Sequence, residues 1–184
     1  DPFNNLMTHW DSNEKELAVG TGSGVSSDLD YRELGEAWST PRIIRIKHSG
    51  KDKWVAVFGA GFNNAANPNY GSAVFVMDLE NEGKLLKKID ISDLSNSSGN
   101  IINSVPSDLT VITANGTDKA NYSGAMVYAA DLEGKITKIN LTENFILDTD
   151  QNSKTFNTIK EDIKTTTLFN SQSTSDNGRY IYAR

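Results

Sequence analysis

The sequence predicts an all-β fold assembled from repeated small sheets, and three observations support this prediction. Short apolar segments with strand-like alternation are separated by clusters of Gly, Asn, Asp and Ser, which favour turns. One pattern, consisting of Ser-x-Pro, an apolar run, Asp-Leu and Gly-Lys, occurs twice along the chain. With 184 residues, the chain is long enough to bury one sizeable core.

The repeated pattern predicts blades of a β-propeller. The matching residues are Pro41 and Pro106, Asp78 and Asp131, Gly83 and Gly134, and Ile89 and Ile139. The distance between the copies decreases from the prolines to the isoleucines, which we interpret as loop insertions in the first copy. A strand-only unit of this length cannot bury both of its faces alone and must stack on its neighbours, as propeller blades do.

We expect two sets of strands in chain order. The first set comprises 42–47, 53–58, 72–78 and 84–91, and the second comprises 107–113, 123–130 and 135–141. Segments 54–58 and 73–77 are apolar on both alternating faces, which indicates strands covered on both sides. From this alternation we assign four aromatic residues to the core between blades: Trp54, Phe58, Phe75 and Tyr128.

Each copy of the pattern predicts a hairpin. In the second copy, the Asp131 side chain is expected to bond back to the backbone, and Gly134 to adopt a positive φ. Asp78 and Gly83 are expected to do the same around a longer turn. The strands that follow the two hairpins carry lysines, which predicts exposed edge strands, because lysine discourages pairing with another sheet.

The predicted organisation is a partial propeller of about three blades. It comprises a blade remnant (1–37), one blade (38–91), a second blade (104–141), and a linker with the start of a further blade (142–184), in which 165–169 is one more strand. Closed propellers have about four to eight blades, so three cannot close a ring. Because the chain also lacks an initiating Met and a signal peptide, we expect it to be an interior part of a longer protein.

The composition argues against several classes of function. The formal net charge is −6 and the basic residues are scattered, which argues against nucleic acid as a partner. The absence of cysteine removes disulfides and thiolate metal sites. The longest apolar runs have five residues, whereas a membrane-spanning helix needs about 20. The sequence therefore predicts no membrane span.

No group of residues predicts catalysis. His9 and His48 lie far apart in the sequence without cysteine or further histidine nearby, so we predict them as polar surface residues. Asp28 and Asp30 are expected to begin a short helix rather than act as an acid/base pair. The Gly-x-Gly that opens segment 59–71 lacks a third glycine and a following helix. It therefore predicts an extended surface loop instead of a phosphate-binding loop.

Three segments of the chain carry a family resemblance. They are 34–41 (Leu-Gly-Glu-Ala-Trp-Ser-Thr-Pro), 53–64 (Lys-Trp-Val-Ala-Val-Phe-Gly-Ala-Gly-Phe-Asn-Asn) and 129–135 (Ala-Ala-Asp-Leu-Glu-Gly-Lys). Together they resemble the C-terminal β-propeller of the PilC/PilY family, large type IV pilus biogenesis and tip-adhesin proteins of Gram-negative bacteria. The resemblance covers about residues 34–141 and implies a quinoprotein-like propeller, with seven blades in the intact protein.

The resemblance also implies a function and a location. It implies a non-enzymatic module that supports assembly and extension of the type IV pilus, twitching motility and adhesion to host cells, and thus virulence. The implied partners are the remaining blades of the same propeller, the subunits of this fimbrium and a host-cell surface receptor. The implied location is outside the cytoplasm, at the pilus tip, the cell surface or the outer membrane.

The family's propellers carry an EF-hand-like calcium loop, and the matching segment here is 113–121. The resemblance assigns its ligand positions to the side chains of Thr113, Asn115, Thr117 and Asn121 and to the carbonyl of Lys119. None of these side chains is a carboxylate, and calcium affinity rises with carboxylate number. Asp118 occupies the position of the turn glycine. We therefore expect this calcium-binding-like loop to be empty or to bind calcium weakly, and we expect no other cofactor.

A quinoprotein dehydrogenase-like enzyme is the alternative, because those propellers share Trp-containing blade repeats and a calcium ion. Such an enzyme needs a calcium held by carboxylates beside a catalytic Asp, together with a flat slot for the cofactor. The sequence shows no such combination. The prediction is therefore a non-enzymatic protein without catalytic residues.

Overall fold

The computed structural model describes residues 31, 33–48, 51–62, 70–93, 103–113, 124–142, 145–147, 159–161, 163–173 and 177–179. Within these ranges the chain forms ten β-strands and no helix, which confirms the all-β prediction. None of the described segments is therefore a helix that could cross a membrane. Most of the predicted blade remnant, residues 1–30, lies outside the described ranges.

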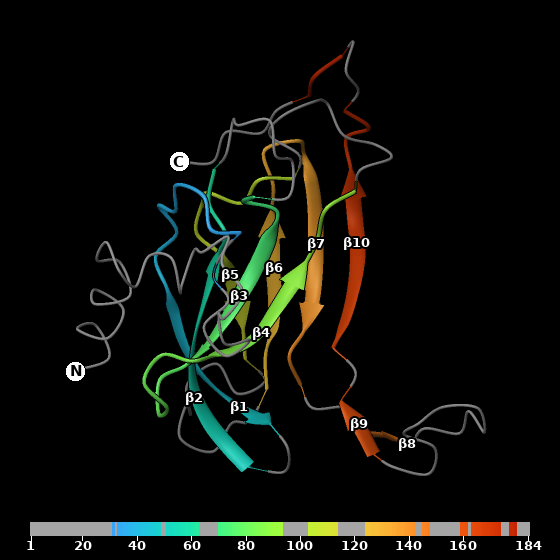
Figure 1. Ribbon diagram of the computed structural model, residues 1–184. Coiled ribbons are helices and arrows are strands. Elements are labelled where there is room, and N and C mark those ends of the chain that lie inside the picture. The colour runs from blue at the N-terminus through green and yellow to red at the C-terminus, as the bar shows by residue number, and fades with distance from the viewer. Residues whose placement is uncertain are drawn as a thin grey trace, which may run out of the picture.

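The first sheet contains four antiparallel strands in chain order (Figure 1). They are β1 (Arg42–His48), β2 (Lys51–Gly59), β3 (Ala73–Asp78) and β4 (Leu85–Asp90), with the spatial order β1-β2-β3-β4. These four strands correspond to the four segments predicted for the first set. Strands that follow one another in the chain are neighbours in the sheet, as in a simple antiparallel meander.

The second sheet has the spatial order β10-β7-β6-β5. Its strands are β5 (Thr110–Ile112), β6 (Met126–Ala130), β7 (Lys135–Asn140) and β10 (Lys164–Asn170), and a separate hairpin of β8 (Phe145–Leu147) and β9 (Ile159–Glu161) intervenes between β7 and β10. The sequence interpretation assigns 165–169 to a further blade, whereas the structure pairs β10 with β7. The pattern of apolar residues in a strand does not reveal this pairing, because the pairing depends on the position at which the chain re-enters the sheet after the β8–β9 hairpin.

The two copies of the repeat occupy different positions in their sheets. The hairpin at Asp78 connects β3 to β4, whereas the hairpin at Asp131 connects β6 to β7. Three strands lie between Pro41 and Asp78, but two lie between Pro106 and Asp131. An additional strand thus accounts for the decrease between the prolines and the aspartates, whereas the longer turn between Asp78 and Gly83 accounts for the decrease between the aspartates and the glycines, as a loop insertion. As a consequence β4 is an edge strand, as predicted, but the edge predicted at β7 is wrong, since β7 lies between β10 and β6.

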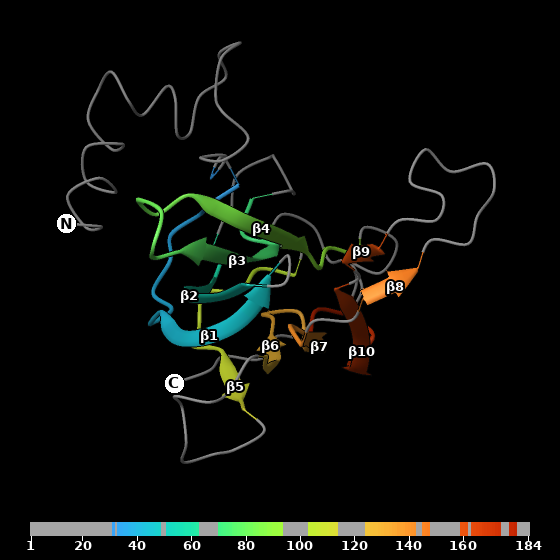
Figure 2. The same cartoon turned by 90° about the horizontal axis from the view of Figure 1, so that it is seen from below.

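An apolar core lies between the two sheets. From the first sheet, β2 contributes Val55 and Val57, and from the second, β6 contributes Val127 and Ala129. Figure 2 shows the sheets as two separate rows of strands, β1 to β4 in one and β5, β6, β7 and β10 in the other. Residues two apart on a strand share a face, so the residues between them, such as Ala56 and Tyr128, point to the opposite faces of the two sheets.

A second core covers the other face of the first sheet. It contains Phe58 from β2 and Phe75 and Met77 from β3, and the ring of Tyr31 lies against that of Phe75, with centroids 5.5 Å apart. Since both faces are covered, every residue of β3 is buried. The sequence prediction of doubly covered strands is confirmed here. Phe58 and Phe75 are buried, as predicted, but they lie in this second core and not in the core between the two sheets, to which the alternation in the sequence assigns them.

The other two aromatic residues predicted in the core are not buried. Trp54 is 39% exposed, so its assignment is wrong. The pairing of β2 with β3 begins at Val55, which leaves Trp54 beyond its last β3 neighbour. Tyr128 is half-buried, because alternation along β6 places it on the face that points away from the first sheet.

The outer face of the second sheet is open among the described residues and carries both apolar and polar side chains, the latter including Lys138 and Asn140. Its large apolar residues are Ile112, Met126, Tyr128, Ile136 and Phe169. Ile112 is 54% exposed and Phe169 is 52% exposed, and the other three are half-buried. The two sheets therefore differ, since the first is covered on both faces and the second on one.

Candidate functional site at the junction of the two sheets

The hairpin between β6 and β7 carries a buried polar network. Asp131 accepts hydrogen bonds from the backbone N–H of Lys135 (2.9 Å) and from the side-chain amide of Asn103 (2.9 Å). The backbone N–H of Asn103 donates to the carboxylate of Glu133 (2.8 Å). All four residues are buried, with at most 5% of their surface exposed. Buried polar groups are tolerated when they are hydrogen-bonded in this way.

This network also reaches the first sheet. The Lys135 ammonium donates to the carbonyl oxygen of Ile91, which follows β4. The backbone N–H of Asp93 donates to the side-chain oxygen of Asn103 (2.6 Å). The end of the first sheet is thus tied to the second sheet by the side chains of Lys135 and Asn103.

Burial changes the titration of the two charged groups at the centre of the network. Burial raises the pKa of the Asp131 carboxyl, although its hydrogen bonds to Lys135 and Asn103 act in the opposite direction. Burial likewise lowers the pKa of the Lys135 ammonium, although nearby carboxylates, first Asp131, oppose this shift. Perturbed pKa values also occur at catalytic sites; here the two groups are hydrogen-bonded to residues that join the two sheets.

The corresponding hairpin between β3 and β4 has a simpler arrangement. Asp78 forms an ion pair with Lys53 and accepts a hydrogen bond from the backbone N–H of Glu80 (3.0 Å). The Tyr31 hydroxyl donates to the carbonyl of Gly83 (2.7 Å). Burial, and to a lesser extent the Asp78 carboxylate, raises the pKa of the Tyr31 phenol. Tyr31 thereby fixes the segment that covers this face of the first sheet.

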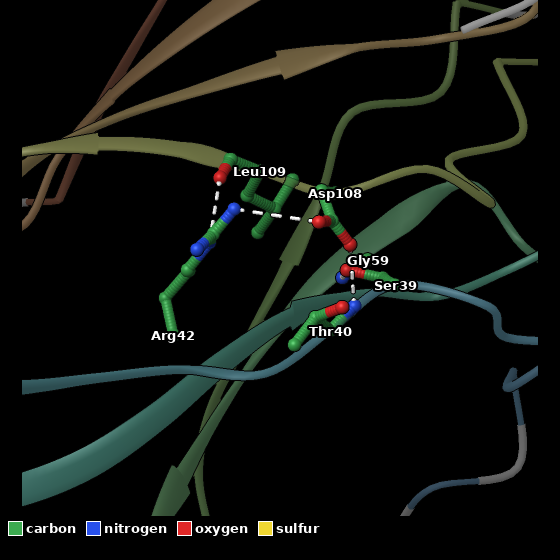
Figure 3. Close-up of polar contacts among 6 residues, drawn as sticks. All are labelled: Ser39, Thr40, Arg42, Gly59, Asp108 and Leu109. Atoms are coloured by element: carbon green, nitrogen blue, oxygen red, sulfur yellow. Dashed lines mark hydrogen bonds and ion pairs between the residues drawn. The ribbon is translucent and has the colours of Figure 1, made fainter. Parts of the chain in front are cut away.

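A second set of contacts joins the sheets near the start of β1 and β5 (Figure 3). The Thr40 backbone N–H donates to the Asp108 carboxylate (2.6 Å), and Arg42 pairs with the same carboxylate (3.3 Å). The Arg42 guanidinium also donates to the carbonyl of Leu109 (3.2 Å). The hydrogen bonds from Thr40, and then the charge of Arg42, lower the pKa of Asp108. Because this pair is exposed, it contributes to orientation more than to stability.

The Gly-x-Gly at 59–61 forms part of the seam between the sheets. A Cβ atom on Gly59 would lie 2.3 Å from the backbone oxygen of Val105, so no larger residue fits there. Gly61 has a φ of 97° and its backbone N–H donates to the same carbonyl (2.9 Å). Residues 59–61 are buried. The prediction of a surface loop is therefore wrong for its first three residues, because they pack against Val105, in the segment that leads into the second sheet.

The two Ser-x-Pro elements lie at this seam as well. The Ser39 hydroxyl accepts a hydrogen bond from the backbone N–H of Gly59 (3.2 Å), as Figure 3 shows. The backbone carbonyl of Ser104 accepts one from the N–H of Leu132 (3.0 Å). The Ser104 hydroxyl is buried and has no hydrogen-bond partner among the described residues. Both serines thus contribute to packing at the entry to a strand.

Most of the predicted calcium loop lies outside the described residues. Thr113 directly follows β5 and is half-buried. The remaining predicted ligands, Asn115, Thr117, Lys119 and Asn121, and the turn position Asp118 are not among the described residues. The described part of the chain contains no cluster of three or more His, Cys, Asp or Glu side chains that suits a metal ion.

The other candidate residues remain apart. His48 ends β1, and His9, Asp28 and Asp30 lie outside the described ranges. Sequence reasoning missed Asn103 and Glu133, which complete the buried network. Asn103 directly precedes a Ser-x-Pro element and has a φ of 46°. An Asn tolerates this conformation better than most residues, and that is the one signal that the sequence offers.

Comparison with known proteins gives no match: no family model, no curated protein and no solved structure matches the chain.

Proposed function

We propose that the chain is a non-enzymatic propeller module of a PilC/PilY-type protein, in which it supports pilus assembly and extension, twitching motility and adhesion to host cells. The proposal rests on the resemblance of segments 34–41, 53–64 and 129–135 to that family. It requires each sheet of the chain to be one blade, packed against the next.

One observation carries the proposal. The described part of segment 53–64 forms β2 and the glycine seam, through which two four-stranded antiparallel sheets pack against each other. Each sheet has its strands in chain order, the arrangement that a propeller repeats around its axis. The most distinctive part of the resemblance is therefore the part that stacks the two sheets.

The open outer face of the second sheet supports the same proposal. Large apolar side chains such as Ile112 and Phe169, half or more exposed on one face, are unfavourable in water when they form a contiguous patch, and such patches are normally covered. In the proposed protein, a further blade of the same propeller covers this face. The pilus subunits and the host-cell surface receptor are then bound by surfaces of the assembled, exported propeller, and calcium has at most a weak site at 113–121.

The test is deletion of the full-length gene in the bacterium that carries it, with complementation by variants. We expect deletion to remove pili from the cell surface and to abolish twitching, as seen by electron microscopy and by motility on agar. The parent gene and the variant Lys87→Ala, at an exposed position of β4, should restore both. Gly59→Leu should restore neither, because its side chain would clash with the backbone of Val105. Normal piliation and twitching in the deletion strain would refute the proposal.

The purified protein separates the proposal from the enzyme alternative. A quinoprotein holds a redox cofactor that absorbs visible or near-ultraviolet light, so we expect no such absorbance. A cofactor spectrum that changes when a substrate is added would favour the dehydrogenase instead.

A further inference from the structure

Strand β10 differs from the other strands in its exposure. All six residues from Lys164 to Phe169 are exposed, so both faces of this strand are open. The edge strands of the first sheet, β1 and β4, each bury part of their side chains. Figure 1 places β10 at the outer end of the second sheet, and it pairs with β7 alone among the described strands.

The composition of β10 also sets it apart. Between Lys164 and Asn170 the strand reads Thr-Thr-Thr-Leu-Phe, without a charge or a proline. Leu168 is 53% exposed and Phe169 is 52% exposed. Natural edge strands are usually protected by charges, prolines or bulges. Among the described residues, the protection of this strand consists of one terminal lysine and a register shift between Thr167 and Phe169 on the β7 side.

We propose that β10 is a pairing edge for a second copy of this chain, with the two β10 strands antiparallel about a two-fold axis at Thr167. In this register Lys164 lies opposite Asn170 of the second copy, so no like charges face each other.

The sequence of the strand favours this register over the parallel one. In-register parallel pairing would set the two Lys164 side chains opposite each other, which is destabilising. An antiparallel pair with a two-fold axis is also self-limiting, because each copy uses its single β10 edge and the assembly closes as a dimer. The partner is therefore a second copy, and the second sheet becomes continuous across the dimer.

The dimer should be weak and concentration-dependent. One strand pair of seven residues is small beside interfaces that support stable association. Sedimentation velocity over a series of concentrations is thus the suitable measurement. We expect the sedimentation coefficient of the parent to rise with concentration toward that of a dimer.

Paired substitutions of equal exposure locate the interface. Leu168→Lys should abolish the rise, because it opposes Thr166 of the second copy and lies diagonal to Lys164 there. The control is Ile112→Lys, on the edge strand β5 of the same sheet, where Ile112 is 54% exposed and Leu168 is 53% exposed. This control should still dimerise. Loss of association in Ile112→Lys, with association intact in Leu168→Lys, would assign the contact to the outer face and overturn the proposal.

Cross-linking tests the register itself. The chain has no cysteine, so Thr167→Cys introduces a single thiol that faces its own copy across the two-fold axis. Opposite residues have Cβ atoms about 4.5–5.5 Å apart, close to disulfide range after small adjustment. Thr165→Cys is the control, since it faces Phe169. We expect several-fold more disulfide dimer at 167 than at 165. Equal cross-linking, or a parent that stays monomeric at all concentrations, would refute the proposal.

Discussion

The hairpins β3–β4 and β6–β7 share one sequence pattern and close in the same way. In each, the glycine N–H donates to the aspartate carbonyl, Gly83 to Asp78 (3.1 Å) and Gly134 to Asp131 (3.1 Å). Both glycines have positive φ, 73° and 78°, as the sequence predicts. Both aspartates are buried, with 2% and 1% of their surface exposed. Up to this point, local sequence determines local structure.

The environments of the two hairpins differ. The partner of Asp78 is Lys53, whose side chain is 24% exposed and reaches solvent. The partner of Asp131 is Asn103, which is 3% exposed. β4 is the edge of its sheet, whereas β7 lies inside its sheet. The same motif thus reaches different degrees of burial because its position in the sheet differs.

The largest effect should come from a pair of aromatic residues at matching positions in the two copies. Phe75 and Tyr128 each lie three residues before the hairpin aspartate, but Phe75 is fully buried and Tyr128 is half-buried. Phe75→Ala should cost about 3–5 kcal/mol of the free energy of unfolding. Tyr128→Ala should cost about half as much, in proportion to the area buried. Urea denaturation of both variants measures the difference, and equal costs would show that a further layer covers Tyr128.

The features that the sequence predicts correctly are those that depend on neighbours along the chain. Continuous apolar runs in 54–58 and 73–77, apolar on both faces of a strand, predict doubly covered strands, and the structure confirms this from Val55 onward. The Asp and Gly spacing predicts both hairpins. Each of these features is encoded within a few residues, by backbone φ preference or by the two-residue period of a strand.

The errors concern features that depend on neighbours in space. Lys135 begins a lysine-containing strand that the sequence predicts to be an exposed edge. In the structure this strand lies between β10 and β6, Lys135 contacts the end of the first sheet, and it is 5% exposed. Trp54 belongs to an alternating apolar run but lies beyond the pairing with β3. The buried partners Asn103 and Glu133 come from a linker and a turn. Neither periodicity nor spacing connects such residues before the sheets are placed together.

At neutral pH, replacing the hairpin aspartate should destabilise the protein more at Asp131 than at Asp78. In Asp131→Asn, the new NH₂ group faces the NH₂ group of Asn103, so two donors meet. The Asn103 amide cannot flip to present its oxygen instead, because that oxygen accepts a hydrogen bond from the backbone N–H of Asp93. An unsatisfied buried donor costs about 1–3 kcal/mol. Asp78→Asn should cost less, because Lys53 can be hydrated when the pair is lost. Chemical denaturation of both variants at pH 7 checks the order, and a larger loss in Asp78→Asn would reverse it.

A smaller effect should follow from the titration of Asp131. Its pKa is raised above the ordinary value of 3.8 by burial, so the folded protein binds this proton more tightly than the unfolded chain. The destabilisation from burying the charge is therefore present above the raised pKa and is lost as the pH falls toward 3.8. The free energy of unfolding of the parent, relative to that of Asp131→Asn, should therefore increase as the pH is lowered from 7 to 4. A constant difference over this range would show that Asp131 does not titrate there.

The smallest effect is expected from adding calcium to the parent protein. The predicted calcium loop, 113–121, belongs to the connection between β5 and β6. The ligand positions assigned by the resemblance, among them Thr113, Thr117 and Asn121, hold no carboxylate. The parent should therefore show no saturable heat in calorimetry and no change in melting temperature when calcium is added. The variant with Thr113→Asp, Thr117→Asp, Asn121→Asp and Asp118→Gly restores the charges and the turn residue.

This variant should bind calcium with a dissociation constant in about the micromolar to millimolar range open to such loops. A ligand that binds only the folded state raises its stability, so the melting temperature of the variant should rise with calcium. Magnesium is the control ion, because it demands a tighter octahedral site and gives up its water reluctantly. Tight calcium binding by the parent would show that hydroxyl, amide and carbonyl oxygens suffice. The second copy of the repeat would then differ from the first in carrying a metal site, and Asn115 and Asn121 would be the first side chains to replace.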